Sequence, residues 1–218
     1  MNKRIIFVRH GKTAWNVEGR LQGAHGDSPL IYTAEIQSDL KALAAYLKLF
    51  NISTVYSSPL KRAYKTASLL SSQISADIQV ITDPGLAEIS FGSFEGLKKE
   101  NLLTDYPVEF DLLSSRTDDI RLQKLGVESF LSAQKRFCKS INDITEKMDD
   151  NQTILIVSHG AISQIGIQRL TNNIYLGGLS NLSLSQVVEQ NGHYIIEKYN
   201  ETAFLTHPVT HQKNTSIK

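Results

Sequence analysis

Two distant stretches of this chain repeat one pattern, an apolar run that leads into a histidine and a glycine. The first reads Ile-Ile-Phe-Val-Arg-His-Gly and ends at Gly11, and the second reads Ile-Leu-Ile-Val-Ser-His-Gly and ends at Gly160. Short runs rich in β-branched residues are typical of strands buried inside a parallel sheet, which is covered by helices on both faces. The pattern therefore predicts an α/β fold, a three-layer αβα sandwich with a mostly parallel central sheet.

The histidines of this pattern, His10 and His159, each follow closely on a predicted strand. Ligands of open α/β sheets bind just beyond the carboxyl ends of the strands, so we expect both imidazoles at that edge. Imidazole changes its charge near neutral pH and can act as a nucleophile, a base or a partner for an anion. The pair is a candidate active site, although a single histidine at a strand end is more often structural.

Strand and helix signals continue along the chain. The glycine-rich segment 9–33 is expected to be a long loop that lies across the site, and Ser58 and Pro59 are expected to open a helix with Ser58 as its N-cap. Further strands are predicted at 54–57, 78–81, 182–188 and 194–199, and helices at 40–47, 97–105, 127–148 and 161–170. Residues 106–126 show no clear pattern. The length of 218 residues favours one domain over 1–200, followed by a polar tail over 201–218.

Composition limits the partners of the chain. With 23 basic and 22 acidic residues the formal charge is +1, which argues against nucleic acid or an anionic membrane as a partner. No apolar run approaches the roughly 20 residues that span a bilayer, and no signal-peptide pattern is present. The single cysteine, Cys138, cannot form an internal disulfide, which fits a reducing compartment. We therefore expect a cytoplasmic protein, and a homodimer joined through the C-terminal hairpin stays open.

Several polar residues near the predicted strand ends suit the chemistry of a phosphoryl group. Its transfer needs positive charge and donors for its oxygens, a nucleophile in line, and an acid for the leaving oxygen. Arg9 and Arg62 carry planar guanidinium groups that match phosphate. Asn16 and Gln22 add neutral donors from the segment 9–33. A neutral His10 has one ring nitrogen available for attack on phosphorus if a backbone carbonyl holds the other.

Four motifs, found in the same order along the chain, resemble those of a known family. They are Val8-Arg9-His10-Gly11 with Asn16 and Gly19-Arg20-Leu21-Gln22-Gly23, then Ser57-Ser58-Pro59-Leu60-Lys61-Arg62-Ala63, then Leu86-Ala87-Glu88 with Phe91-Gly92-Ser93-Phe94-Glu95-Gly96, and finally Ser158-His159-Gly160. From residue 4 to about residue 165 the chain resembles the phosphoglycerate mutase branch of the histidine phosphatases. The resemblance implies a phosphoglycerate mutase-like fold.

The resemblance also implies roles for individual residues. His10 is similar to the nucleophile of the family, which is phosphorylated on a ring nitrogen and then discharged. Arg9, Arg62 and His159 match the phosphate pocket, with Asn16 beside them. Glu88 matches the proton donor, which makes physical sense because a nearby phosphate dianion disfavours the charged form of a carboxyl group. After giving up its proton, the same carboxylate can activate water against the phosphohistidine.

Each of these residues has an ordinary structural interpretation as well. Alone, Arg62 would be a solvated helix residue and Glu88 a turn carboxylate, while Asn16 could cap a local turn. Their places in the motifs favour the functional interpretation, and for Gln22 both interpretations stay open. We predict no metal and no cofactor. His207 and His211 are four positions apart, an interval that suits two metal ligands on a helix, but Pro208 argues against a helix there.

The segment between Glu88 and His159 bears on whether the chain is a phosphatase or a mutase. Mutases of the family look longer there and carry paired arginines, whereas residues 97–126 of this chain hold dispersed basic and acidic residues and no Arg-Arg pair. Because a mutase must keep water from the phosphohistidine, we favour a metal-independent phosphatase that hydrolyses small phosphomonoesters. A phosphoglycerate-type mutase and a catalytically silent phospholigand-binding protein are the alternatives. Lys12, which adds charge beside the pocket, and residues 106–126 bear on the choice of substrate.

Overall fold

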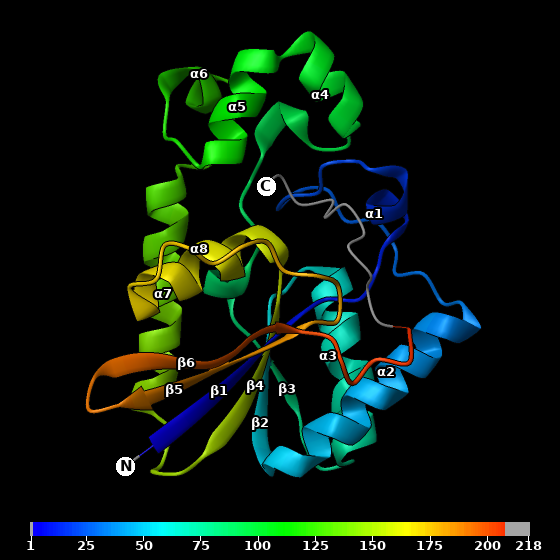
Figure 1. The fold of residues 1–218 in the computed structure, drawn as a ribbon, viewed down its shortest axis with the longest axis vertical. Helices are drawn as coiled ribbons and strands as arrows, with labels where there is room; N and C mark the ends of the chain where they lie inside the picture. Colours follow the sequence, from blue (N-terminus) through cyan, green and yellow to red (C-terminus); the bar gives the residue numbers. More distant parts are fainter. Residues whose placement is uncertain (1, 208–218) are drawn as a thin grey trace.

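The computed structural model describes residues 2–207, which fold around a six-stranded sheet (Figure 1). Its strands are β1 (Asn2–Arg9), β2 (Ile52–Ser57), β3 (Val80–Thr82), β4 (Thr153–Ser158), β5 (Leu184–Gln190) and β6 (His193–Glu201), and their order is β3-β2-β4-β1-β5-β6. The strands from β3 to β1 in this order pair in parallel, whereas β5 is antiparallel to both β1 and β6. The mostly parallel sheet predicted from the sequence is confirmed.

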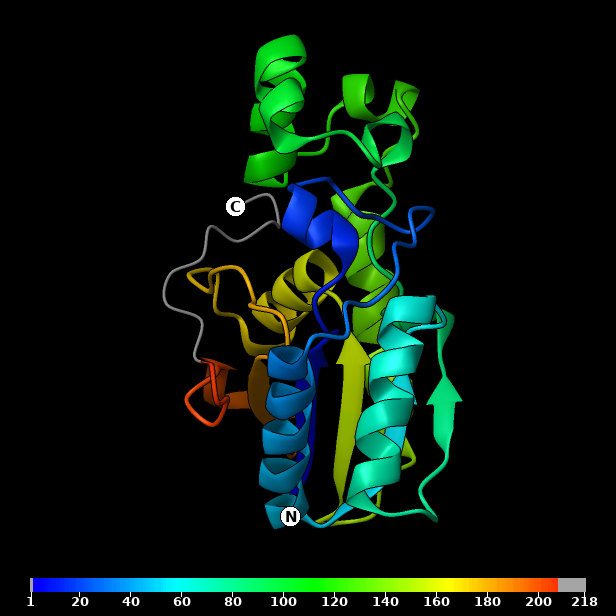
Figure 2. The same ribbon diagram turned by 90° about the vertical axis from the view of Figure 1, so that its right-hand side faces the viewer.

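Helices cover both faces of this sheet (Figure 2). The helices α2 (Ala34–Leu47) and α3 (Lys61–Ile74) lie on one face, and α7 (Phe130–Glu146) and α8 (Gly160–Thr171) lie on the other. Side chains of β1 alternate between the two faces, because Ile5 and Phe7 pack with α7 whereas Ile6 and Val8 pack with α2 and α3. Both faces are therefore apolar, which explains the uninterrupted apolar run in the sequence and confirms the three-layer sandwich.

The two helices α7 and α8 pack closely against each other. A Cβ atom added at Gly166 of α8 would lie 2.1 Å from a ring carbon of Phe137 of α7, so glycine is required for this approach. The helix α7 is shorter than the predicted 127–148, because Ser129 caps it by accepting a hydrogen bond from the Ser132 N–H. Val127 is buried outside the helix, where it forms a β-bridge with Phe91.

Two local predictions at the N-terminal half are wrong. The segment 9–33 is not all loop, since it contains α1 (Ala14–Glu18), which begins at a capping box between Thr13 and Asn16. The helix α3 begins at Lys61 with Leu60, not Ser58, at its N-cap position, and the Ser58 hydroxyl bonds the ring of His159 and the Leu60 N–H, which precedes the helix. Asp27, from the segment 9–33, accepts hydrogen bonds from the first backbone N–H groups of α3.

Three short helices stand together beyond the carboxyl ends of the strands (Figure 1). They are α4 (Lys99–Asp105), α5 (Pro107–Ser115) and α6 (Ile120–Lys124). The sequence predicts α4 at 97–105 but assigns nothing to 106–126, where α5 and α6 each bury a single residue, Leu113 and Leu122 respectively. With one buried side chain each, these helices lack the periodic apolar face that sequence patterns detect. Three 3-10 turns complete the described elements, η1 (Lys48–Phe50), η2 (Pro84–Leu86) and η3 (Gly92–Phe94).

The C-terminal end of the described chain returns to α2. The buried Asp39 accepts hydrogen bonds from the Thr206 hydroxyl and the His207 N–H. Residues 208–218 of the predicted tail, including His211, lie outside the described residues, and the division into one domain and a tail stays a prediction. Within residues 2–207 we find no helix with the length and apolar character needed to cross a membrane.

Candidate active site

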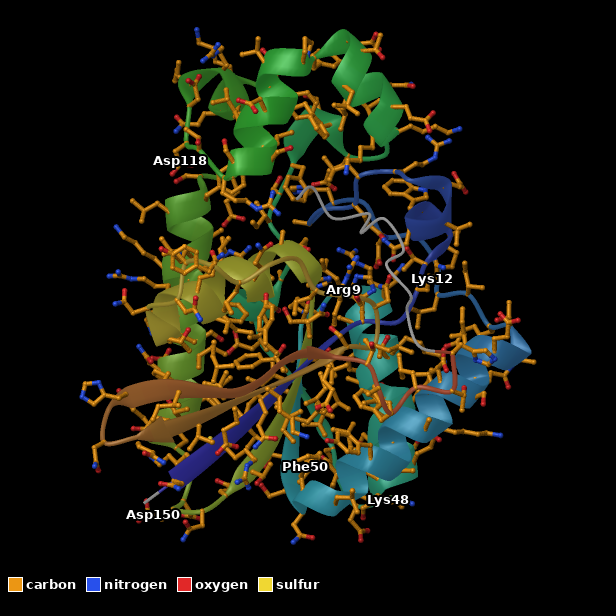
Figure 3. All side chains as sticks on the ribbon, in the orientation of Figure 1. Arg9, Lys12, Lys48, Phe50, Asp118 and Asp150 are labelled. Atoms are coloured by element: carbon orange, nitrogen blue, oxygen red, sulfur yellow. The ribbon has the colours of Figure 1, made fainter. Side chains whose placement is uncertain are left out.

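The predicted site residues gather where parallel strands end. Arg9 and Ser158 are register partners at the last paired position of β1 and β4, so the residues that follow, His10 and His159, leave the sheet side by side. Figure 3 shows Arg9 and Lys12 near the middle of the molecule, on the side of the sheet that faces α4, α5 and α6, whereas Lys48 lies at the bottom of the view. The parallel register therefore brings the two strand-His-Gly motifs together, although their histidines lie 149 positions apart in the sequence.

His10 is buried and held in one tautomer. Its Nδ1 lies 2.7 Å from the carbonyl oxygen of Gly11, and since a carbonyl only accepts, Nδ1 carries the proton and Nε2 keeps a lone pair. Burial lowers the pKa of His10 well below 6.5, and the positive charges of Arg62 and Arg9 lower it further. The imidazole is neutral at pH 7, as a nitrogen nucleophile requires.

His159 faces His10 edge to face, with ring centroids 5.2 Å apart and the ring planes at 61°. Its Nε2 lies 2.7 Å from the hydroxyl of Ser58, which also accepts a hydrogen bond from the Leu60 N–H. When the hydroxyl donates its proton to Nε2, the ring proton of His159 lies on Nδ1. This Nδ1 is buried and has no hydrogen-bond partner in the structure. Burial, followed by the charge of Arg62, lowers the pKa of His159 well below 6.5.

Two buried guanidinium groups supply positive charge. Arg9 donates to the carbonyl of Leu179, and burial lowers its pKa to about 10, so it stays charged at neutral pH. Arg62, 1% exposed, donates from Nη1 to the Gly26 carbonyl at 2.9 Å and from Nη2 to the Gly23 carbonyl at 2.9 Å. Burial lowers the pKa of Arg62, and the charges of Glu88 and Asp27 oppose that effect. The Nε of Arg62 is buried without a hydrogen-bond partner.

Glu88 lies at the N-terminus of α8. Its carboxylate accepts hydrogen bonds from the backbone N–H groups of Ala161 at 3.1 Å, of Ile162 at 2.8 Å and of Ile89 at 3.1 Å. The N-terminus of a helix stabilises a carboxylate because its N–H groups lack partners within the helix. Since His159 immediately precedes α8, this anchor brings Glu88 to the same cluster of buried residues, close enough for its charge to affect both Arg9 and Arg62.

Asn16 and Gln22 lie at the margin of this cluster. The Asn16 side-chain oxygen accepts from the Thr13 N–H at 3.2 Å, which is the local capping role considered from the sequence. The same oxygen also lies 3.3 Å from Nδ2 of Asn181, which donates to the His10 carbonyl at 2.9 Å. Gln22 accepts from the Thr13 hydroxyl at 2.9 Å, and its Nε2 is buried without a partner.

The sequence-based interpretation missed several supporting residues. Asn181, which ties the backbone of His10 to Asn16, lies outside every recognised motif and gives no signal in the sequence. Glu95 lies within a motif but was given no role; its carboxylate accepts from the N–H groups of His25, Gly26 and Phe91. It thereby holds the loop whose carbonyls bind Arg62. A Cβ atom added at Gly23 would lie 2.3 Å from Glu95, so glycine is needed for this contact.

A neutral ring nitrogen, fixed positive charge and an adjacent carboxyl group are what phosphoryl transfer through histidine requires. Their position at the carboxyl edge of a parallel sheet places the chain among α/β phosphoryl-transfer enzymes. The chain belongs to the histidine phosphatase superfamily (branch 1), whose family model matches residues 5–202.

Similarity extends over nearly the whole chain. Phosphoserine phosphatase 1 of Hydrogenobacter thermophilus is 29% identical over 208 residues, which cover 93% of this chain and 94% of that protein. A mutant phosphoserine phosphatase from Entamoeba histolytica, solved in complex with phosphoserine, has a TM-score of 0.75 at 29% identity and covers 93% of this chain and 99% of its own. Bacillus stearothermophilus YhfR shares the fold with a TM-score of 0.81 at 24% identity, covering 93% of this chain and 99% of its own.

These findings confirm the predicted activity class and the resemblance stated from the motifs. The chain is a phosphatase, an enzyme of the phosphoric monoester hydrolase class.

Proposed function

We propose that this phosphatase hydrolyses small phosphomonoesters through a phosphohistidine formed on Nε2 of His10, with Glu88 as proton donor and then as base. The observation that carries the proposal is the hydrogen bond from His10 Nδ1 to the Gly11 carbonyl, which leaves the Nε2 lone pair for phosphorus. The lowered pKa of His10 keeps that lone pair unprotonated at neutral pH.

The phosphate group is proposed to bind between Arg9, Arg62 and His159, with Asn16 beside them. The buried Nε of Arg62 and Nδ1 of His159 have no partners within the protein, and a phosphate oxygen satisfies such donors. Gln22 carries a third unpartnered buried donor, its Nε2, and we assign it a supporting role at the margin of the same pocket.

The reaction proceeds in two half-reactions. In the first, His10 Nε2 bonds to phosphorus, the bond from phosphorus to the ester oxygen breaks, and Glu88 gives its proton to the leaving alkoxide. The phosphate dianion of the bound substrate favours the protonated form of Glu88 at this stage. In the second, Glu88 takes a proton from water, the water oxygen bonds to phosphorus, and the N–P bond breaks with its electron pair returning to Nε2.

Phosphoserine is the first substrate to test, because similar proteins bear the name phosphoserine phosphatase. Inorganic phosphate released from a panel of small phosphomonoesters, phosphoserine included, ranks the candidates. The panel contains 3-phosphoglycerate, together with bisphosphoglycerate as a phosphodonor. Formation of 2-phosphoglycerate in place of phosphate would point to the alternative mutase activity.

The role of His10 is tested with His10→Ala. We expect turnover to fall at least about 10³-fold, because the nucleophile of a covalent mechanism is lost. Wild-type enzyme quenched during turnover should carry an acid-labile phosphoryl group on His10, seen by mass spectrometry of the intact protein and its peptides. Retained turnover in His10→Ala, or a label on another residue, contradicts the mechanism, and failure to trap a phosphoenzyme with any active substrate revives the binding-protein alternative.

We also infer a cytoplasmic location for the enzyme. The lone Cys138 fits this location, because a single cysteine cannot form the internal disulfides that are common in oxidising compartments. Cell fractionation with an antibody against the protein tests the location, and a homodimer, the other open prediction, is tested by the mass measured in solution.

A further inference from the structure

Arg136 of α7 binds the backbone of the segment that carries Glu88. Its Nη1 donates to the carbonyls of Gly85 at 2.9 Å and Ala87 at 2.7 Å, and its Nη2 donates to the carbonyl of Glu88 itself at 3.1 Å. The carbonyl between them, that of Leu86, accepts from the Ser158 hydroxyl at 2.8 Å. Side chains of α7 and β4 therefore satisfy every carbonyl over residues 85–88.

Glu128 completes the arrangement and fixes Arg136. The Arg136 Nε donates to Glu128 Oε1 at 2.7 Å, and Nη2 donates to Oε2 at 3.0 Å. With the three bonds to carbonyls, all five N–H donors of the guanidinium are used. Glu128 also binds the backbone two residues after Glu88, at Ser90. Its Oε2 accepts from the Ser90 N–H at 3.3 Å, and its own N–H donates to the Ser90 carbonyl at 2.8 Å.

The segment around Glu88 depends on these contacts. Between β3 and α4 it contains only the 3-10 turns η2 and η3, so neither a helix nor a strand fixes the backbone of Glu88. Its carboxylate is anchored separately on the first N–H groups of α8. The arginine neighbours Phe137, whose ring packs on Gly166 of α8. The backbone and the carboxylate of Glu88 are therefore fixed by two helices that pack on each other.

We propose that Arg136, oriented by Glu128, is a positioning residue that sets the direction of the Glu88 carboxyl group toward the leaving oxygen. The inference rests on the proposed function, in which Glu88 protonates that oxygen. An arginine is suited to this task because its rigid planar fork reaches three carbonyls and a carboxylate at once, which a lysine ammonium cannot reproduce.

The test compares leaving groups in the first half-reaction. Release of the leaving group is measured in a single turnover with p-nitrophenyl phosphate, whose phenolate leaves without a proton, and with an alkyl phosphate such as phosphoserine, whose alkoxide needs one. For Arg136→Met we expect alkyl release to slow by about 10²-fold and aryl release by less than about threefold, because only the former requires a well-placed acid. Arg136→Lys should behave like Arg136→Met.

Two further variants keep the test decisive. Lys135→Met removes the neighbouring exposed charge on the same helix and should change neither rate. Glu128→Gln loses the ion pair but keeps the side-chain shape, and we expect the same selective loss in smaller measure, so it replaces Arg136→Met if that protein does not fold. Equal slowing of alkyl and aryl release in Arg136→Met or Glu128→Gln, or no slowing in either of them, overturns the positioning role.

Failure of the proposed function is recognised in the wild-type enzyme and not in the variants. A wild-type enzyme that releases no leaving group, or that carries no phosphoryl group on His10, would contradict the proposed function and the positioning role together. A wild-type enzyme that forms phospho-His10, beside variants with an unchanged alkyl-to-aryl ratio, overturns the inference about Arg136 alone.

Discussion

At the scale of single residues, the site places two histidines beside two arginines, and the positive charges of the arginines disfavour protonation of the histidines. His10 and His159 are buried close to Arg9 and Arg62, so their pKa values fall and both rings are neutral. The guanidinium groups keep their charge because neighbouring carboxylates, above all Glu88, offset the cost of burial. The result is a buried cluster in which positive charge lies beside neutral imidazole, as the proposed phosphate site and nucleophile require.

Replacing Arg62 tests how much the positive charge of this site contributes to activity. We expect Arg62→Ala to lower kcat/KM by about 10² to 10³-fold, by analogy with the loss of a charge-stabilising donor in other enzymes. Steady-state kinetics with the best substrate of the panel measures the effect, and thermal unfolding checks the fold. Arg121→Ala, which removes an exposed arginine paired with Asp119, is the matched control and should leave kcat/KM unchanged. Equal values for both variants would remove Arg62 from the phosphate pocket.

At the scale of elements, the start of α3 depends on a residue far away in the sequence. Leu60, its N-cap, contributes no side-chain hydrogen bond. Asp27 accepts from the Lys61 N–H at 2.8 Å and from the Arg62 N–H at 3.4 Å, and it also lies 3.3 Å from Arg62 Nη1. One carboxylate thus caps the helix and orients the arginine that the helix presents to the pocket.

This double role predicts that stability and activity change together in Asp27→Ala. Loss of a helix cap costs about 1 kcal/mol of unfolding free energy, which urea denaturation measures. KM for the substrate should rise in the same variant, because Arg62 loses a partner that orients it. Asp77→Ala, at an exposed position beyond the other end of α3, serves as the control. A variant with lower stability but an unchanged KM would show that Asp27 acts only as a cap.

The elements also mark where sequence patterns succeed. β1 and β4 were predictable because both faces of each strand are buried. Such strands need apolar residues at successive positions, and the sequence shows these as an uninterrupted apolar run. The cap of α3 was not predictable. The Ser58 hydroxyl has the sequence position of a local N-cap, but it bonds His159, which is 101 residues away. The helices α5 and α6 escaped prediction because each buries only one residue.

At the scale of the whole molecule, the two buried histidines couple folding to pH. In the unfolded chain they titrate near pH 6.5, whereas in the folded protein their pKa values lie well below that value. Below pH 6.5 the unfolded state therefore binds protons that the folded state does not, so the folded state loses stability as the pH falls.

From pH 6 to pH 5 we expect the unfolding free energy to drop, and the two histidines contribute at most about 2.8 kcal/mol, since one fully titrating group contributes about 1.4 kcal/mol per pH unit. Urea denaturation at the two pH values measures the change. In His10→Ala the histidine contribution should be about half as large, while the carboxylates contribute equally to both proteins. An identical pH dependence in wild type and variant would contradict the neutral state of buried His10.

The sequence by itself determined the buried strands, the mostly parallel sheet, and the motif residues His10, Arg62, Glu88 and His159 that the sheet edge gathers. These follow from local patterns, namely apolar runs and short motifs. Only the tertiary structure decided what orients the motif residues: Gly11 and Ser58 for the imidazole tautomers, Asp27 for Arg62, and Arg136 with Glu128 for Glu88. The physical reason is that most of these partner residues lie far away in the sequence. Their hydrogen bonds to the motif residues form only once the layers of the fold have packed.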